Sequence, residues 1–345
     1  MDEFEVIRKF FADLTPKRSD VTLGIGDDGA ILQLAPGHEL VATTDTLVER
    51  HHFYDDAAPY DIGWKSLATG LSDLAAMGAD PHSCLLAITL PEADASWLKE
   101  FSRGFRDLAV QHGVSLIGGN TTHGPASITV TCFGTIQAGR AVRRAGAKNG
   151  DIVCVTGTLG DAALGLRTVQ LRMQAESEQR RLFRRKSDPP QGLDPGFALT
   201  DVPSQEELEF LRGRLDRPTP RVRAGQMLRD YAHALIDLSD GLVGDLPHVL
   251  AASRVGAEVW PDRLPTSEVF RRLTPPAYTI QLQVAGGDDY ELCACLPAEA
   301  VNEVRRKLNV PLTIVGRVVE TPGLRLVTAE GKPLPLKFSG FRHFQ

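Results

Sequence analysis

The sequence has few cysteines, and their spacing disfavours two common uses of that residue. Five are present, an odd number, and no two of them form a Cys-x-x-Cys pair. This pattern argues against both a zinc ribbon and a framework of disulfides. Four of the five lie in apolar, strand-like runs, so we expect buried free thiols and a reducing compartment. The five are Cys84, Cys132, Cys154, Cys293 and Cys295.

A basic excess and a long apolar run are also missing, and we expect no secretory leader. The formal net charge is −6, whereas a nucleic-acid-binding protein normally carries a basic face. No run approaches the ~20 apolar residues of a membrane-spanning helix. The acidic stretch Met1–Glu5 has no apolar signal core. We therefore expect a cytoplasmic protein with no nucleic-acid partner and no membrane partner.

Several familiar catalytic motifs are absent as well. The sequence contains no GxxxxGK[ST] phosphate loop, no HExxH zinc motif and no GxSxG nucleophile motif. Its nine histidines show no metal-ligand spacing. The adjacent His51 and His52 lack a third partner, which favours an ordinary histidine pair over a transition-metal site. Chemistry must come from other residue types.

The predicted elements favour an α/β fold with mixed, α+β-type sheets rather than strict βαβ alternation. At 345 residues the chain exceeds what one core usually serves, so we predict two domains, 1–149 and 150–345. In the first, apolar periodicity predicts helices over 3–14, 61–77 (with Asp61 as N-cap) and 95–112 (closed by Gly113), and strands over 40–42, 83–90, 114–117 and 127–136.

The second block begins with a predicted strand, 152–155, and a predicted helix, 162–171. Residues 172–204 have the weakest structural pattern, and regular structure resumes at Ser204. Two interpretations of this segment are a basic binding patch and a mobile solvated insertion, and we favour the insertion. Its distinguishing residues are Arg180, Arg181, Arg184, Arg185, Lys186, Pro189, Pro190 and Pro195.

Carboxylates beside Gly, Ser or Thr recur along the chain, each next to an apolar run. Taken singly, each has an ordinary explanation as a surface turn, a solvated helix position or a helix cap. Gathered together, they would repel one another unless cations held them. Oxygen ligands favour Mg²⁺, which normally brings phosphates with it, so the pattern predicts a protein that handles a nucleotide triphosphate. The groups are the loop Gly24–Ala30, the predicted turn Thr43-Thr44-Asp45 at a strand end, Asp73 in a predicted helix, the predicted turn Gly118–Thr122, the turn Asp237–Gly241 with Ser239 or Asp240 as an alternative helix cap, and Gly286–Leu292.

In their order along the chain, these motifs resemble those of the thiamine-monophosphate kinases. The resemblance covers nearly the whole chain outside 172–204. TTDTLVE-x-x-HF with SDLAAMGA separates that family from aminoimidazole ribonucleotide synthetase, selenophosphate synthetase and a hydrogenase-maturation protein, which share its fold. The reactive or C-terminal cysteine expected in the last two is absent here. The motifs are GIGDDGA, TTDTLVERHHF, DIGWKSLATGLSDLAAMGA, GGNTTHGP, RRAGAKNGD, VTGTLGDAALGL, RPTPRV, IDLSDGL, GGDDYEL and GFRHF.

The resemblance implies ATP-dependent phosphorylation of thiamine monophosphate to thiamine diphosphate, with several Mg²⁺ ions and ATP as co-substrate. It also implies an aminoimidazole ribonucleotide synthetase-like fold whose N-terminal ATP- and Mg-binding domain pairs with its twin in a homodimer. No side chain is assigned as a catalytic acid, base or nucleophile. Carried over by position, the metal ligands are Asp28, Thr43, Thr44, Asp45, Asp73, Asn120, Asp237 and Asp240; the ATP contacts are Gly119, Asn120, Arg144 and Ser239; and the substrate contacts are His52, Asp288 and Phe341.

Three positions depart from the family pattern. Asn120 stands where Asp is frequent and removes one negative charge. Asp288 replaces the usual Glu and reaches about one methylene less far. Phe341 replaces a Trp or Tyr and keeps a ring for stacking without its polar group. These changes bear on substrate affinity more than on the type of reaction.

A phosphate acceptor is already deprotonated near neutral pH, so the reaction requires no general base. We therefore hypothesise direct in-line transfer without a phosphoenzyme, on ions held by the carboxylates. Two alternatives remain. One is a related kinase that acts on another phosphate ester. The other is a non-catalytic nucleotide sensor, suggested by Asn120 and Asp288, which would bind ATP without turnover.

Overall fold

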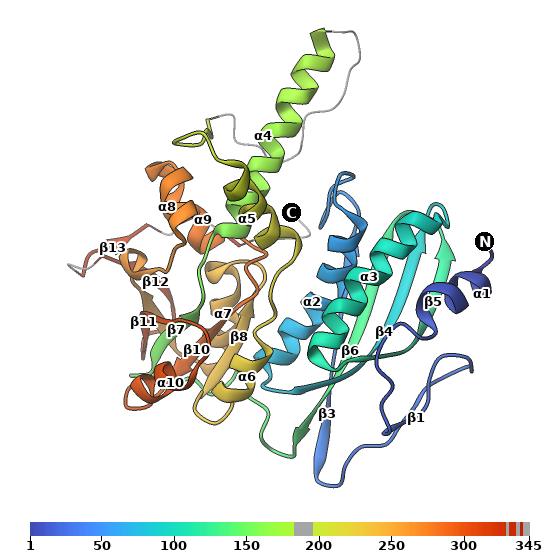
Figure 1. Ribbon diagram of the computed structural model, residues 1–345. Coiled ribbons are helices and arrows are strands. Elements are labelled where there is room, and N and C mark those ends of the chain that lie inside the picture. The colour runs from blue at the N-terminus through green and yellow to red at the C-terminus, as the bar shows by residue number, and fades with distance from the viewer. Residues whose placement is uncertain (183–195, 329–330, 336–338, 341–345) are drawn as a thin grey trace.

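The computed structural model describes residues 1–182, 196–328, 331–335 and 339–340 (Figure 1). Within them the strands form a four-stranded, a seven-stranded and a small two-stranded sheet. Parallel and antiparallel pairs occur in both larger sheets. This mixed α/β architecture confirms the predicted fold class. None of the described helices is both long enough and apolar enough to cross a membrane.

The N-terminal half is built on the four-stranded sheet. Its strands lie in the order β3 (His38–Val48), β6 (Ser127–Gln137), β4 (Asp80–Leu90) and β5 (Ser115–His123), with β4 and β5 parallel and the other pairs antiparallel. Helices α2 (Pro59–Ala76) and α3 (Ala95–His112) cover one face (Figure 1). Burial alternates along β6, as expected for a sheet with one covered face. Ahead of the sheet lie α1 (Glu3–Val6), a π-helical turn (Ile7–Phe11), β1 (Val21–Leu23) and β2 (Ile31–Leu32).

The C-terminal half is built on the seven-stranded sheet. Its strands lie in the order β13 (Pro333–Leu334), β12 (Gly323–Val327), β9 (Gly256–Val259), β11 (Leu312–Val319), β7 (Ile152–Thr156), β10 (Glu291–Leu296) and β8 (Ala234–Leu238). Strands β8 and β10 are buried along their whole length, which explains their nearly continuous apolar sequences. The helices are α4 (Asp161–Leu182), α5 (Gln205–Asp216), α6 (Val222–Leu228), α7 (Leu242–Ser253), α8 (Glu268–Leu273), α9 (Thr279–Ala285) and α10 (Val301–Lys307), with 3₁₀ turns at Pro261–Arg263 and Pro276–Tyr278.

Helix α2 lies between the two halves and packs against both (Figure 1). The Trp64 Nε1 donates a hydrogen bond to the Pro218 carbonyl at 2.9 Å. Further along, α6 approaches so closely that a Cβ on Gly225 would lie 2.0 Å from the Ala75 carbonyl oxygen. Because nearly every side of α2 is covered, the polar residues it carries are held at the junction of the two halves.

Two predicted turns are wrong, because their polar residues lie inside strands. Strand β3 continues through Thr43-Thr44-Asp45 and pairs with β6 without interruption. Strand β5 likewise continues through Gly118–Thr122. Glycine is needed at Gly119, since a Cβ there would lie 1.8 Å from the Leu86 carbonyl oxygen. Pairing with neighbouring strands outweighs the local turn preference of these residues.

Two helix boundaries also differ from prediction. Ala58 is the N-cap of α2 and Pro59 is its first residue, so Asp61 lies in the first turn and does not cap the helix. Proline suits that position because its fixed φ is already helical. Helix α4 continues to Leu182, so residues 172–182 of the predicted insertion are helical. Arg184, Arg185 and Lys186 lie outside the described residues.

Two other predictions are confirmed. Gly113 closes α3 in the left-handed conformation, with φ of 64°, which glycine adopts without a steric penalty. All five cysteines are buried and free. Burial raises the pKa of their thiols, which keeps them protonated and chemically inert.

Candidate active site

Three aspartates from distant parts of the sequence converge where α2 meets both sheets. Because side chains alternate along β3, Thr43 and Asp45 face α2, and the Thr43 hydroxyl donates a hydrogen bond to Asp73 Oδ2. One residue earlier on α2, the Ser72 hydroxyl donates to Asp237 Oδ2 at 2.8 Å, at the end of β8. Predicted ligands from both halves of the chain therefore come together. We call Asp45, Asp73 and Asp237 the carboxylate cluster.

Burial makes the ionised form of all three acids unfavourable. Burial first, and then the charge of Asp73, raises the pKa of Asp45 to about 7. The same two causes raise the pKa of Asp237 to about 8. Burial also raises the pKa of Asp73, against the lowering effect of the hydrogen bond from Thr43. A divalent cation would reverse these shifts, because it stabilises the ionised form that burial and repulsion disfavour.

The residues of the cluster fit Mg²⁺ well. Asp45 Oδ2 is buried and accepts no hydrogen bond from any described residue, and carboxylate oxygens are the ligands that Mg²⁺ prefers. Across the described part of the chain, no group of three or more His, Cys, Asp or Glu side chains is arranged to hold a metal ion by itself. The carboxylates would therefore supply part of the coordination. That suits Mg²⁺, which usually keeps several waters and binds substrate phosphates.

A fourth buried acid, Asp245, shapes the turn beyond β8, and the sequence analysis did not identify it. It lies in the first turn of α7, whose N-cap is Gly241, so the alternative that Ser239 or Asp240 caps this helix is wrong. The backbone N–H groups of Asp240 (at 2.9 Å) and Ser239 donate to the Asp245 carboxylate instead. Burial raises the pKa of Asp245 to about 7. Its sequence signal was an acidic residue in the first turn of a predicted helix.

Two predicted substrate contacts, His52 and Asp288, are joined by a residue that the sequence analysis missed, Lys65. The Lys65 Nζ lies 3.1 Å from Asp288 Oδ2 and donates a hydrogen bond to the His52 carbonyl oxygen at 3.3 Å. The His52 Nδ1 accepts a hydrogen bond from the Val48 N–H at 3.0 Å, so a neutral ring carries its proton on Nε2. The signal for Lys65 was a single lysine inside an otherwise weakly polar helix.

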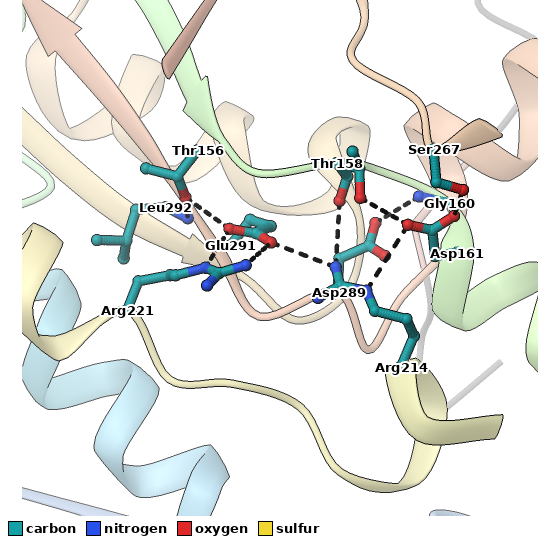
Figure 2. A network of polar contacts seen from close by, with 10 residues as sticks. All are labelled: Thr156, Thr158, Gly160, Asp161, Arg214, Arg221, Ser267, Asp289, Glu291 and Leu292. Carbon is teal, nitrogen blue, oxygen red and sulfur yellow. Dashed lines mark hydrogen bonds and ion pairs between the residues drawn. The ribbon is translucent and has the colours of Figure 1, made fainter. Parts of the chain in front are cut away.

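A buried polar network anchors the strand that follows Asp288 (Figure 2). Glu291 on β10 is fully buried and accepts hydrogen bonds from both Nε (2.6 Å) and Nη2 (2.5 Å) of Arg221. Asp289 Oδ2 accepts a hydrogen bond from the Gly160 N–H at 2.8 Å, and burial raises the Asp289 pKa well above its ordinary value. These contacts tie Asp289 to the turn before α4 and Glu291 to the start of α6. The backbone next to Asp288 is therefore held in place.

Other predicted ligands lie apart from the carboxylate cluster. Thr44 faces the opposite side of β3, where its Oγ1 lies 3.0 Å from Thr131 Oγ1. Gly119 and Asn120 lie on the exposed part of β5, and Asp28 lies in the exposed loop between β1 and β2. Among the residues that the structure describes, no hydrogen bond or ion pair joins the side chains of Asp28, Thr44 or Asn120 to the cluster.

Arg144 lies close enough to the cluster for its charge to lower the pKa of Asp73. The same charge lowers the pKa of Asp245. An open groove of about 590 Å³ lies beside Arg143, and this volume is within the usual range for small-molecule sites. Phe341, the third predicted substrate contact, lies outside the described residues. The groove is lined by Glu39, Leu40, Val41, Ala42, Met77, Ala141 and Arg143.

Comparison with known proteins matches both halves of the chain to one family. Residues 26–136 match the AIR synthase related protein, N-terminal domain, and residues 148–329 match the AIR synthase related protein, C-terminal domain. A thiamine-monophosphate kinase of Salmonella typhimurium is 42% identical over 99% of this chain and 98% of its own. The crystal structure of a thiamine-monophosphate kinase from Stenotrophomonas maltophilia K279a is 43% identical, with a TM-score of 0.78 over 90% of this chain and 92% of that one. The structure of AaThiL complexed with AMPPCP and TMP is 29% identical, with a TM-score of 0.69 over 93% of this chain and 92% of that one.

Proposed function

The chain belongs to the family of thiamine-monophosphate kinases, and from this premise we propose that it transfers the γ-phosphoryl group of ATP to thiamine monophosphate, giving thiamine diphosphate. A solved relative binds AMPPCP, an ATP analogue, together with TMP. The observation that carries the proposal is the carboxylate cluster, in which Ser72 and Asp73 of α2 meet Asp45 of β3 and Asp237 of β8. Buried acids at a junction of two halves suit a site that holds two phosphate-bearing substrates.

On the donor side, the chain's residues would hold Mg²⁺ and the nucleotide. Asp45, Asp73 and Asp237 would be the central ligands, completed by the predicted ligands of the surrounding loops and strands. Bound Mg²⁺ supplies charge neutralisation, which lets an anionic acceptor approach the γ-phosphate. Arg144 would add positive charge beside the cluster. The surrounding predicted ligands are Asp28, Thr43, Asn120 and Asp240, whereas Thr44 faces away from the cluster and would not take part. The predicted nucleotide contacts are Gly119, Asn120, Arg144 and Ser239.

On the acceptor side, the residues complement a molecule with a cationic ring and a phosphate. The Asp288 side chain is 32% exposed and can meet the positive charge of the thiazolium ring. His52 would donate from Nε2, because its Nδ1 already accepts a backbone hydrogen bond. The acceptor phosphate is itself the nucleophile, so no side chain needs to remove a proton. Direct in-line transfer then follows from orientation and charge alone.

We also propose that the chain works as a homodimer in the cytoplasm, with domains at 1–149 and 150–345. Helices α2 and α3 cover one face of the four-stranded sheet, while Thr44 and Thr46 on the other face are exposed. Leu40, on the same strand, is 43% exposed. A second copy laid on this face would cover it. Light scattering after gel filtration should give twice the 37.5 kDa chain mass, and a monomer would contradict the dimer alone.

The direct experiment is Mg²⁺-dependent conversion of thiamine monophosphate and ATP to thiamine diphosphate and ADP, followed by chromatography. Product formation that stops with EDTA supports the proposal. ATP binding without any product would favour the nucleotide sensor, and turnover with a different phosphate ester would favour a related kinase. A protein-bound ³²P label that chases into product would refute direct transfer while leaving the reaction itself intact.

A further inference from the structure

Lys65 is a buried cation at the junction of the two halves. Its side chain is 3% exposed, and it projects from α2 toward the loop that carries Asp288. Taking an ammonium group out of water is strongly unfavourable unless a carboxylate and further polar partners compensate it. Here Asp288 Oδ2 at 3.1 Å and the His52 carbonyl oxygen at 3.3 Å supply that compensation. Asp216 also lies within the influence of the Lys65 charge, but it pairs with Arg212.

The Lys65 contacts join three separate segments: helix α2, the turn after β3 that contains His52, and the loop before β10. Asp288 has a φ of 66°, a left-handed conformation that a non-glycine residue rarely adopts unless other contacts hold it. Its N–H donates a hydrogen bond to the Ser239 carbonyl oxygen at 2.8 Å, and its carboxylate meets Lys65. Backbone and side chain of Asp288 are thus fixed by different elements.

The exposure of Asp288 distinguishes this pair from a purely structural one. In the Glu291–Arg221 pair, both side chains are enclosed, at 0% and 16% exposure. In the Lys65–Asp288 pair the lysine is enclosed, whereas the Asp288 side chain is 32% exposed. Lys65 therefore holds one side of the Asp288 carboxylate, and the other side remains accessible to a ligand.

We propose that Lys65 is a positioning residue for the acceptor substrate. It holds the Asp288 carboxylate and the His52 turn in fixed positions across the junction, so that a cationic ring bound against the exposed side of Asp288 presents its phosphate to the donor. This inference rests on the proposed function. Lys65 itself does not touch the substrate, so it is not a catalytic residue. Its loss should affect the acceptor and leave nucleotide binding largely intact.

The test is Lys65→Met, which removes the charge and keeps most of the side-chain volume. We expect the KM for thiamine monophosphate, and its Kd by calorimetry without nucleotide, to rise about 10- to 100-fold, the range expected when one hydrogen bond of a charged group is lost. The KM for ATP should change less than about twofold. Lys65→Arg, which keeps the charge, should recover part of the loss. If Lys65→Met folds poorly, Lys65→Gln gives the same comparison.

Arg229→Met is the matched control. Arg229 also joins the two halves, since its Nη1 donates to the Gly78 carbonyl at 3.0 Å, but Gly78 lies about 20 Å further along the helix axis. This variant should bind the acceptor normally. In a double-mutant cycle, Lys65→Met combined with Asp288→Asn should weaken acceptor binding by clearly less than the product of the two single effects.

Three outcomes would overturn the inference. Unchanged acceptor binding in Lys65→Met would show that the contact positions nothing. Equal losses for ATP and acceptor, matched by Arg229→Met, would assign Lys65 a structural role, as would fully multiplicative effects in the cycle. If the unaltered chain neither binds nor phosphorylates thiamine monophosphate, the proposed function fails and the role of Lys65 falls with it. Normal turnover by the unaltered chain separates the two failures.

Discussion

Replacing Asp45 by asparagine is expected to stabilise the metal-free protein while removing its activity. The substitution keeps the shape of the side chain and can retain the hydrogen bond from Thr69. What it removes is a carboxylate with one oxygen buried beyond reach of any described donor. A metal site keeps buried acids that destabilise the metal-free protein. Replacing one of them should therefore raise the stability of the metal-free protein and lower its activity.

The size of the effect follows from the pKa. The Asp45 pKa rises from 3.8 to about 7, and each pKa unit corresponds to about 1.4 kcal/mol. The asparagine side chain would therefore relieve up to about 4 kcal/mol at pH 8, less about 1 kcal/mol for a weaker hydrogen bond. A net gain of about 3 kcal/mol corresponds to a rise in Tm of roughly 5 °C for a chain of this size.

The size of this stabilisation depends on pH. The folded protein holds the Asp45 proton up to about pH 7, whereas the unfolded chain releases it near 3.8. The stability of the unaltered protein therefore falls as pH rises between these values, while the asparagine of the variant does not titrate. The difference in Tm between Asp45→Asn and the unaltered chain should be close to zero at pH 4 and largest at pH 8.

Thermal unfolding in EDTA at pH 4, 6 and 8 measures this difference directly. Adding Mg²⁺ at pH 8 should raise the Tm of the unaltered chain and raise that of Asp45→Asn much less. The kcat/KM should fall about 100-fold or more, at least as much as loss of an outer-shell metal partner. Asp13→Asn, at an aspartate that is 81% exposed, is the control. Lower stability of metal-free Asp45→Asn at pH 8, or equal stabilisation of both proteins by Mg²⁺, would refute the reasoning.

Three further predictions concern stability. Glu291→Gln should cost about 3–5 kcal/mol of unfolding free energy, because it leaves the Arg221 charge buried without its partner; denaturant titration measures it, and a loss below about 1 kcal/mol would contradict it. Gly225→Ala should cost about 1–3 kcal/mol, since its Cβ would lie 2.0 Å from the Ala75 carbonyl oxygen; an unchanged Tm would show that α6 can move away from α2. The Asp20 pKa is lowered to about 2, chiefly by the hydrogen bond from an arginine, so this pair stabilises the fold above about pH 4 and loses that effect toward pH 2. Asp20→Asn should therefore lower Tm at pH 7 but not at pH 2, and an equal loss at both would contradict it.

Local sequence patterns predicted the structure correctly where it depends on residues that are close together in the sequence. The helix 95–112 and its closing Gly113 agree with α3 residue for residue, because an amphipathic period and a left-handed glycine are both local signals. The same reasoning failed at Thr43-Thr44-Asp45, where Thr and Asp indicated a turn. An eleven-residue strand passes through them because β6 pairs along the whole length.

The sequence by itself determined the family, the fold class and the set of acidic residues available for metal binding, because motif order and residue type are properties of the linear chain. Tertiary structure alone decided which of those residues meet. It turned Asp45 toward α2 and Thr44 away from it, and it brought Ser72 to Asp237, 165 positions apart. It also placed Lys65 behind Asp288. Such pairings depend on how helices and sheets pack across the junction, and no local pattern records that.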